Sequence, residues 1–89
     1  MAEIELVIKT KVGLHARPAA LFVQLAKQFQ SEIQINNSGK MANAKSILSV
    51  LALGVYQGTK VVLSAEGEDE NEALTALKEL IESNFGEPE

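Results

Sequence analysis

The 89-residue sequence contains no cysteine and only one histidine, so it lacks the ligands of the commonest zinc sites. It has no apolar run long enough to span a membrane, and its N-terminus lacks the basic start and apolar stretch of a secretory signal. The net charge of -4 argues against nucleic acid as the main partner. We therefore expect one soluble, cytoplasmic domain over residues 1–89, with no metal and no direct contact with membrane or nucleic acid.

Hydrophobic periodicity predicts seven elements in the order strand, helix, strand, strand, helix, strand, helix. In the first strand, Ile4, Leu6 and Ile8 alternate with Glu3, Glu5 and Lys9. The other elements are a helix over about 16–29, strands at 32–36 and 40–43 around a turn at 37–39, a helix over 46–53 stopped by Gly54, a strand that starts at Gly58 and a helix opened by Asp69. Alternation of this kind favours an antiparallel sheet with helices on one face and water on the other. The water-facing side chains are expected to include Glu3, Glu5, Gln34, Asn36 and Lys60.

The last helix has the clearest start signal in the sequence. Asp69 is expected to cap it, and Glu72, three residues later, would complete a capping box. The acidic run 68–72 would also favour the positive end of this helix, because carboxylates are stabilising there.

The only histidine, His15, lies just before a helix whose first turn contains Pro18. A lone histidine is often structural or simply exposed, and that interpretation stays open on the residues alone. Two features favour a role with anions. Histidine is a poor capping residue, and Arg17 can donate several hydrogen bonds to a phosphate near the helix start, which itself attracts anions. No serine lies in a recognisable nucleophile elbow, which disfavours a hydrolytic triad.

Three segments carry a resemblance to a known family. They are Gly-Leu-His-Ala-Arg-Pro-Ala at 13–19, Lys-Ser-Ile-Leu at 45–48 and Gly-Thr-Lys-Val-Val-Leu-Ser-Ala-Glu-Gly-Glu-Asp-Glu at 58–70. Over essentially its whole length the chain resembles HPr, the histidine-containing phosphocarrier of the bacterial sugar phosphotransferase system. The resemblance implies an α+β open-faced β-sandwich, with a four-stranded antiparallel sheet and three helices on one face, in agreement with the predicted order.

The resemblance also implies a function. In this family, enzyme I takes phosphate from phosphoenolpyruvate and passes it to the carrier histidine, which delivers it to a sugar-specific IIA domain. By the motif, His15 accepts the phosphoryl group through Nδ1, Arg17 neutralises its oxygens, and the backbone N–H groups of Ala16 and Arg17 bind them. No cofactor is implied, because the phosphoryl group comes from phosphoenolpyruvate through enzyme I. The chain is expected to be a monomer and a substrate of enzymes rather than an enzyme itself.

A carrier must bind several partners in turn, so we expect an apolar patch around the histidine. Its predicted members are Ala20, Val23, Ile47, Leu48 and Leu51, with a polar and basic rim of Arg17, Gln24, Lys27 and Lys45. The alternative is that the apolar residues belong to the core of two helices. For Ile47 and Val50 the sequence favours neither a core nor a surface position. Val23 is expected to be exposed, because it lies on the side of its helix away from Phe22 and Phe29.

Ser46 precedes the second predicted helix and admits two interpretations. A serine at this point is a good N-cap. In HPr proteins of many bacteria, the matching serine is phosphorylated by HPr kinase/phosphorylase, and the product binds a catabolite-control transcription regulator. The chain departs from many relatives at Val12, where a small polar residue is common. It also departs at Leu48 and Leu51, where methionine is common in many relatives from Gram-positive bacteria, although the patch stays apolar.

The leading hypothesis is therefore a phosphoryl carrier in a phosphoenolpyruvate-driven relay, with regulatory phosphorylation of Ser46. The alternative, from a different class, is a regulatory binding module that acts mainly as a serine-phosphorylated corepressor. A third possibility is a carrier in a relay without sugar permeases, which would serve nitrogen or metabolic regulation. The presence of His15 favours a carrier over a purely regulatory module.

Overall fold

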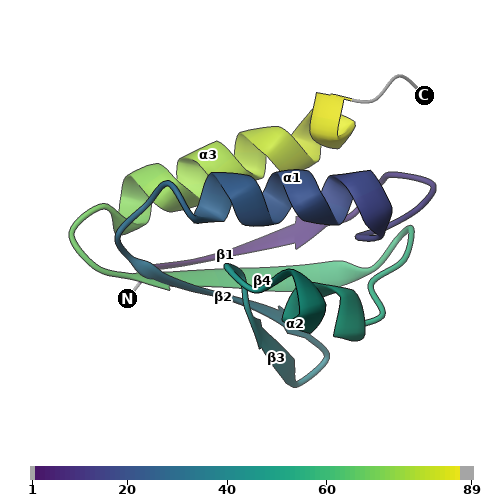
Figure 1. Cartoon of the computed structure of the whole chain (residues 1–89), viewed down its shortest axis with the longest axis horizontal. Helices are drawn as coiled ribbons and strands as arrows, with labels where there is room; N and C mark the ends of the chain where they lie inside the picture. Colours follow the sequence, from purple (N-terminus) through teal and green to yellow (C-terminus); the bar gives the residue numbers. More distant parts are fainter. Residues whose placement is uncertain (1, 87–89) are drawn as a thin grey trace.

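The computed structural model describes residues 2–86 and shows the predicted order of elements (Figure 1). The strands are β1 (Ala2–Val7), β2 (Glu32–Asn37), β3 (Lys40–Asn43) and β4 (Lys60–Glu66), and the helices are α1 (Ala16–Ala26), α2 (Ile47–Ala52) and α3 (Glu70–Glu82), followed by a 3-10 turn, η1 (Asn84–Gly86). The strands form one antiparallel sheet in the order β1-β4-β2-β3. The three helices cover one face of it, so the predicted α+β open-faced sandwich is confirmed.

The register of the sheet places apolar side chains on the face that the helices cover. Leu6 of β1 lies opposite Val61 of β4, and Ile35 of β2 lies opposite Leu63 of β4. All four side chains are buried. The exposed residues of the open face include Glu3, Glu5, Gln34 and Lys60, as predicted, and Asn36 is half-buried. On the open face Glu5 and Lys60 form an ion pair of 3.8 Å.

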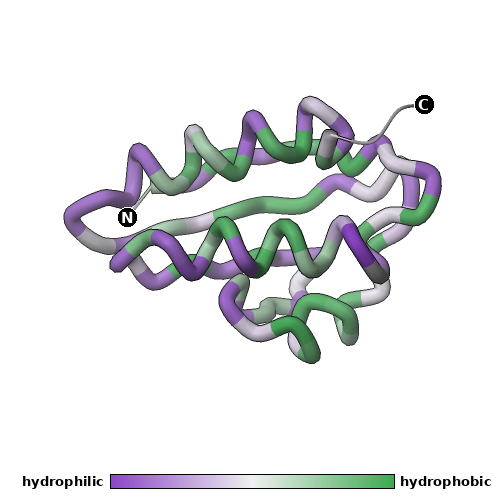
Figure 2. The backbone as a smooth tube through the Cα atoms, turned by 45° about the horizontal axis from the view of Figure 1, so that its top comes forward, coloured by the Kyte–Doolittle hydropathy of each residue, from purple (hydrophilic) through white to green (hydrophobic). Residues whose placement is uncertain are grey.

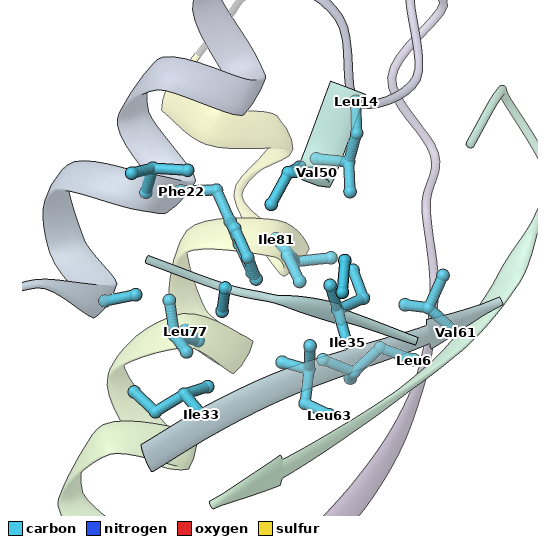
Figure 3. Close-up of a cluster of buried hydrophobic side chains, with 14 of the residues drawn as sticks. Leu6, Leu14, Phe22, Ile33, Ile35, Val50, Val61, Leu63, Leu77 and Ile81 are labelled. Atoms are coloured by element: carbon cyan, nitrogen blue, oxygen red, sulfur yellow. The ribbon is translucent and has the colours of Figure 1, made fainter. Parts of the chain in front are cut away.

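The core lies between the helices and the sheet (Figure 3). Phe22 of α1 and Leu77 and Ile81 of α3 pack above Ile35 and Leu63, and each of these side chains is at most 2 % exposed. Figure 2 shows hydrophilic and hydrophobic segments alternating along α1 and α3, as expected for helices with one buried face. Burying each large side chain contributes roughly 1.5–3 kcal/mol, so this cluster accounts for much of the stability. Within residues 2–86 no helix is long and apolar enough to cross a membrane.

Two predicted boundaries were wrong. Helix α1 ends at Ala26 rather than Phe29, because the N–H groups of Gln28 and Phe29 donate to the carbonyls three residues back, a tighter 3-10 pattern. Strand β4 begins at Lys60 rather than Gly58. Gly58 instead forms a turn with a φ of +89°, and its N–H donates to the Ile8 carbonyl at 2.7 Å.

The predicted capping box at the start of α3 was also wrong. Asp69 is the N-cap residue, but its side chain makes no capping hydrogen bond. Its carboxylate accepts instead from the N–H groups of Gln30, at 2.8 Å, and Ser31, at 2.9 Å, and from the Ser31 hydroxyl. The Ser31 hydroxyl and the Gln30 N–H lower the pKa of Asp69 below its ordinary value, because they stabilise the charged form. Asp69 therefore joins the segment before β2 to the start of α3.

Candidate functional site

The loop before α1 is held in one conformation by contacts on both sides. Within the loop, the Gly13 N–H donates to the Thr10 carbonyl at 3.1 Å, and the buried Thr10 hydroxyl donates to the Gly13 carbonyl at 2.8 Å. Gly13 has a φ of +62°, and a Cβ there would lie 2.4 Å from the Val55 carbonyl oxygen. The N–H of Leu14 donates to that same oxygen at 3.1 Å. The chain therefore enters His15 from a fixed loop, and only glycine fits at position 13.

His15 is the N-cap residue of α1, with an extended backbone (φ -118°, ψ 159°) and an exposed side chain. Its side chain makes no capping hydrogen bond. The imidazole is oriented by the loop instead, since Nδ1 lies 3.0 Å from the Val12 carbonyl oxygen. The ring thus sits at the helix start without using the N–H groups there.

The first turn of α1 is built to attract an anion. The N–H groups in the first turn of a helix have no intrahelical partner. Those of Ala16 and Arg17 are the first two of α1, and Pro18 has no N–H. No acidic side chain lies in this turn, so nothing within it neutralises the positive end of the helix dipole. The Arg17 side chain is exposed. Backbone donors at a helix start, together with an arginine two residues after the histidine, can hold a phosphoryl group. In the part of the chain that the structure describes, no cluster of acidic or histidine side chains could hold a metal ion.

The predicted apolar patch is present in part. Leu48 is 77 % exposed and Ile47 is 37 % exposed, both in the first turn of α2. Val50 is fully buried, which decides the question left open for Ile47 and Val50. Ala20 and Leu51 are half-buried.

Val23 was predicted to be exposed, and this was wrong, since only 4 % of the residue is exposed. The prediction counted one apolar stripe on α1, the stripe of Phe22 that faces the sheet. Helix α1 also packs against α3 and α2, so its buried face is wider and includes Ala19 and Ala26 with Val23. Val23 therefore belongs to the core and is not available to a partner.

Of the predicted rim, Gln24 and Lys27 are exposed. Lys45 is half-buried, and its Nζ donates to the Phe29 carbonyl at 2.7 Å, in the turn that follows α1. This contact joins the turn after α1 to the segment just before α2. We call the predicted residues that remain exposed or half-buried, apart from Lys45 with its bound amine, the docking surface. It consists of Arg17, Ala20, Gln24, Lys27, Ile47, Leu48 and Leu51.

Ser46 is the N-cap of α2, as one of its two interpretations predicted. Its Oγ accepts from the Ser49 N–H at 3.4 Å, and its carbonyl accepts from the Val50 N–H at 3.0 Å. The residue is half-buried and precedes the exposed Ile47 and Leu48. The structure therefore shows a long, weak cap beside the docking surface.

Sequence reasoning missed the residues that support the histidine. Thr10 and Val55 orient the loop through the contacts described above, and the Val12 carbonyl orients the ring. Tyr56 is 69 % exposed, and its Cα lies beside Gly13. Glycine at position 13 is a turn signal in the sequence, because it favours the last position of a four-residue turn. The contact with Val55 joins segments about forty residues apart, and no local pattern reveals it.

These features define a class of protein. Within residues 2–86, the fold presents one exposed histidine at a helix start that has no acidic side chain in its first turn. Helix α2, which contacts this helix, carries exposed apolar side chains. Such a domain can carry a phosphoryl group on its surface and offer it to other macromolecules.

Comparison with known proteins identifies the family. A family model for the PTS HPr component phosphorylation site matches residues 2–83. The chain therefore belongs to the HPr family of phosphocarrier proteins, as the resemblance of its motifs predicted.

The similarity extends to individual proteins over nearly the whole chain. The HPr-like protein Crh of Halalkalibacterium halodurans is 50 % identical over 82 residues, which cover 92 % of this chain and 98 % of that protein. The phosphocarrier protein HPr of Xylella fastidiosa is 45 % identical over 87 residues, 98 % of each. The crystal structure of HPr-C-His from Thermoanaerobacter tengcongensis superposes with a TM-score of 0.98 at 57 % identity and covers all of both chains. Relatives thus include both phosphocarriers and a protein named for its likeness to them.

Proposed function

We propose that this phosphocarrier accepts a phosphoryl group from enzyme I on His15, at Nδ1, and delivers it to the IIA domains of sugar permeases. The observation that carries the proposal is the exposed imidazole at the uncapped start of α1. Phosphoryl transfer needs positioning and charge stabilisation more than covalent chemistry from the protein. The N–H groups of Ala16 and Arg17, with the Arg17 guanidinium, supply both.

The site suits a carrier because it binds phosphate only mildly. His15 is exposed and rests on one helix start and one arginine, so the phosphoryl group stays accessible to the next acceptor. A more enclosed site would stabilise the phosphorylated form and slow its release. In this proposal the chain itself turns over no substrate and needs no cofactor, since phosphoenolpyruvate supplies the phosphoryl group through enzyme I.

The docking surface would bind each partner in turn. Leu48 and Ile47 supply exposed apolar area, and Lys27 and Arg17 supply positive charge on a chain whose net charge is -4. Local positive charge attracts acidic partner surfaces and raises the association rate more than the affinity. A small apolar centre keeps each complex short-lived, as a relay requires. We expect the protein to act as a cytoplasmic monomer.

Phosphorylation of Ser46 is the second part of the proposal. A kinase/phosphorylase would place about two negative charges directly before Ile47 and Leu48. These charges would repel acidic partners such as enzyme I without refolding α2. The similarity to Crh supports a regulatory role beside the carrier role, in which the serine-phosphorylated form binds a catabolite-control regulator. A module that acts mainly as this corepressor remains the alternative.

The test of the carrier role is to incubate the protein with phosphoenolpyruvate and a bacterial enzyme I and to measure its intact mass. We expect one phosphate per chain, labile in acid, because a phosphohistidine N–P bond hydrolyses readily. His15→Ala should gain none and should keep its thermal transition, since the side chain caps nothing.

Ser46→Ala is the matched control, because it removes the other phosphorylatable N-cap and should still gain the acid-labile phosphate. No adduct on the folded wild-type protein, with an enzyme I that modifies a known HPr, would overturn the carrier role. The corepressor alternative would then be favoured.

A further inference from the structure

The contact between His15 and Val12 favours one of the two tautomers of the neutral ring. Nδ1 lies 3.0 Å from the Val12 carbonyl oxygen. A carbonyl oxygen can only accept, so Nδ1 must be the donor and must bear the hydrogen. In the neutral ring, the free lone pair is then on Nε2. The resting ring therefore has its lone pair on the nitrogen that the proposed function does not use.

The Val12 carbonyl is held in place by its neighbours rather than by the histidine. It lies inside the Thr10–Gly13 turn, which is closed by the Gly13 N–H to the Thr10 carbonyl and by the Thr10 hydroxyl to the Gly13 carbonyl. Thr10 is only 3 % exposed. Just after the turn, the Leu14 N–H donates to the Val55 carbonyl at 3.1 Å, which ties this end of the loop to a distant segment. The direction of the Val12 carbonyl is thus fixed from both ends of the turn.

We propose that the Val12 carbonyl is a latch that keeps the resting His15 ring in its Nδ1–H form, and that Thr10 is the positioning residue that holds the latch. The effect on phosphoryl transfer rests on the proposed function, whereas the tautomer of His15 and the role of Thr10 do not. It assigns a role to a buried threonine hydroxyl that no sequence motif of the site includes.

The chemical consequence follows from the balance of the transfer step. Attack needs the Nδ1 lone pair, so the ring must first turn from Val12, lose the Nδ1 proton to water and take up a proton on Nε2. The N–P bond then forms while the bond from phosphorus to the donor's nitrogen breaks, and the donor keeps that electron pair. Only a ring that has turned from Val12 and carries its proton on Nε2 can attack phosphorus. The transfer rate therefore scales with the fraction of molecules in that form.

The first test reads the tautomer directly. Because the chain has one histidine, protein labelled with ¹⁵N-histidine gives a single pair of ring nitrogen signals. Long-range ¹H–¹⁵N correlation in alkaline solution, where a histidine ring is neutral, should show Nδ1 as the protonated nitrogen in most molecules. A wild-type ring that is mainly Nε2–H would overturn the latch. This measurement needs no partner and no variant.

Two variants then test the role of Thr10. Thr10→Val removes the hydroxyl at nearly constant shape and should raise the Nε2–H fraction at least about threefold, whereas Thr10→Ser keeps the donor and should match the wild type. A purely structural threonine would change stability in Thr10→Val and leave the tautomer ratio as it was. An unchanged tautomer ratio in a folded Thr10→Val protein would contradict the role assigned to Thr10.

The third test links the latch to transfer. Phosphoramidate, a small donor that needs no docking, should phosphorylate Thr10→Val faster than wild type by the same factor as the rise in the Nε2–H fraction. Equal rates, or a product phosphorylated on Nε2, would overturn the latch. If phosphoramidate phosphorylates Thr10→Val on Nδ1 faster than wild type, as expected, and enzyme I transfers nothing, the latch stands and the proposed relay fails.

Discussion

The starts of α1 and α2 show how similar backbone positions can serve different purposes. His15 and Ser46 are both N-cap residues with extended backbones, at φ values of -118° and -115°. Ser46 accepts a hydrogen bond from Ser49 and so satisfies part of its own helix. His15 makes no such bond, and no acidic side chain lies in the first turn of its helix. In the proposed function, the helix start without a side-chain cap is the one that holds the phosphoryl group.

A third helix start sharpens the difference. At α3, Asp69 also fails to cap, but Glu70 and Glu72 place negative charge in the first turn, and the Glu70 carboxylate accepts from the Gly67 N–H at 3.2 Å. The dipole of α3 is thus already compensated. An uncapped helix start is therefore insufficient for anion binding. It must also lack acidic residues of its own, as α1 does.

The largest expected effect comes from the loop that presents His15. Gly13→Ala should lower the free energy of unfolding by about 2–5 kcal/mol, since it combines a left-handed backbone with a clash against Val55. Gly54→Ala, in the loop after α2, is the matched control. Its φ is +68° and nothing lies within 4 Å of a Cβ there, so about 1–2 kcal/mol is expected. Urea unfolding of both variants gives the comparison, and equal losses would show that the Val55 contact does not restrict position 13.

The next effect tests whether charge at the start of α2 affects the start of α1. Ser46→Asp keeps a capping side chain and should leave the unfolding free energy within about 0.5 kcal/mol of the wild type. It should slow phosphorylation of His15 by enzyme I about tenfold, because the new charge lies before Leu48 on the docking surface. Ser46→Asn caps without charge and is the control for transfer kinetics. Should Asn and Asp slow transfer equally, the electrostatic explanation of regulation fails.

The smallest effect concerns the start of α3. The pKa of Asp69 is held below its ordinary value of 3.8 by the Ser31 hydroxyl and backbone donors. A lowered folded-state pKa stabilises the fold at pH above the unfolded value, and this stabilisation is lost as pH falls through the folded value. Thermal unfolding of wild type and Asp69→Asn from neutral pH to about pH 2 should give a stability difference that shrinks below about pH 4. A difference that does not change with pH would contradict this linkage.

Much of the fold could be predicted from the sequence because alternation and helical periodicity are local. Ile33 and Ile35 on β2, or Leu77 and Ile81 on α3, face the core as their spacing indicates. The position of His15 before Pro18 likewise predicted a histidine at a helix start. These features depend on residues within one or two turns of each other.

What could not be predicted depends on contacts distant in sequence. Val23 is buried because other helices cover α1, and the hydrogen bonds between Asp69 and Ser31 span 38 residues. Lys45, which was expected in the exposed rim, instead donates to the Phe29 carbonyl, 16 residues earlier. The direction of the Val12 carbonyl is a property of the closed turn, which side-chain patterns do not encode. Tertiary packing thus decided which polar groups were available for function.

The carrier role requires unloading as well as loading. We would purify the phosphorylated protein away from enzyme I, mix it with a IIA domain in a single turnover, and follow the intact mass of both partners. We predict that each phosphate lost from His15 appears on the IIA domain, one for one, and that the chain returns to its unmodified mass. Phosphate released to water, with no gain by any IIA domain tested, would show that this protein is phosphorylated without relaying the group.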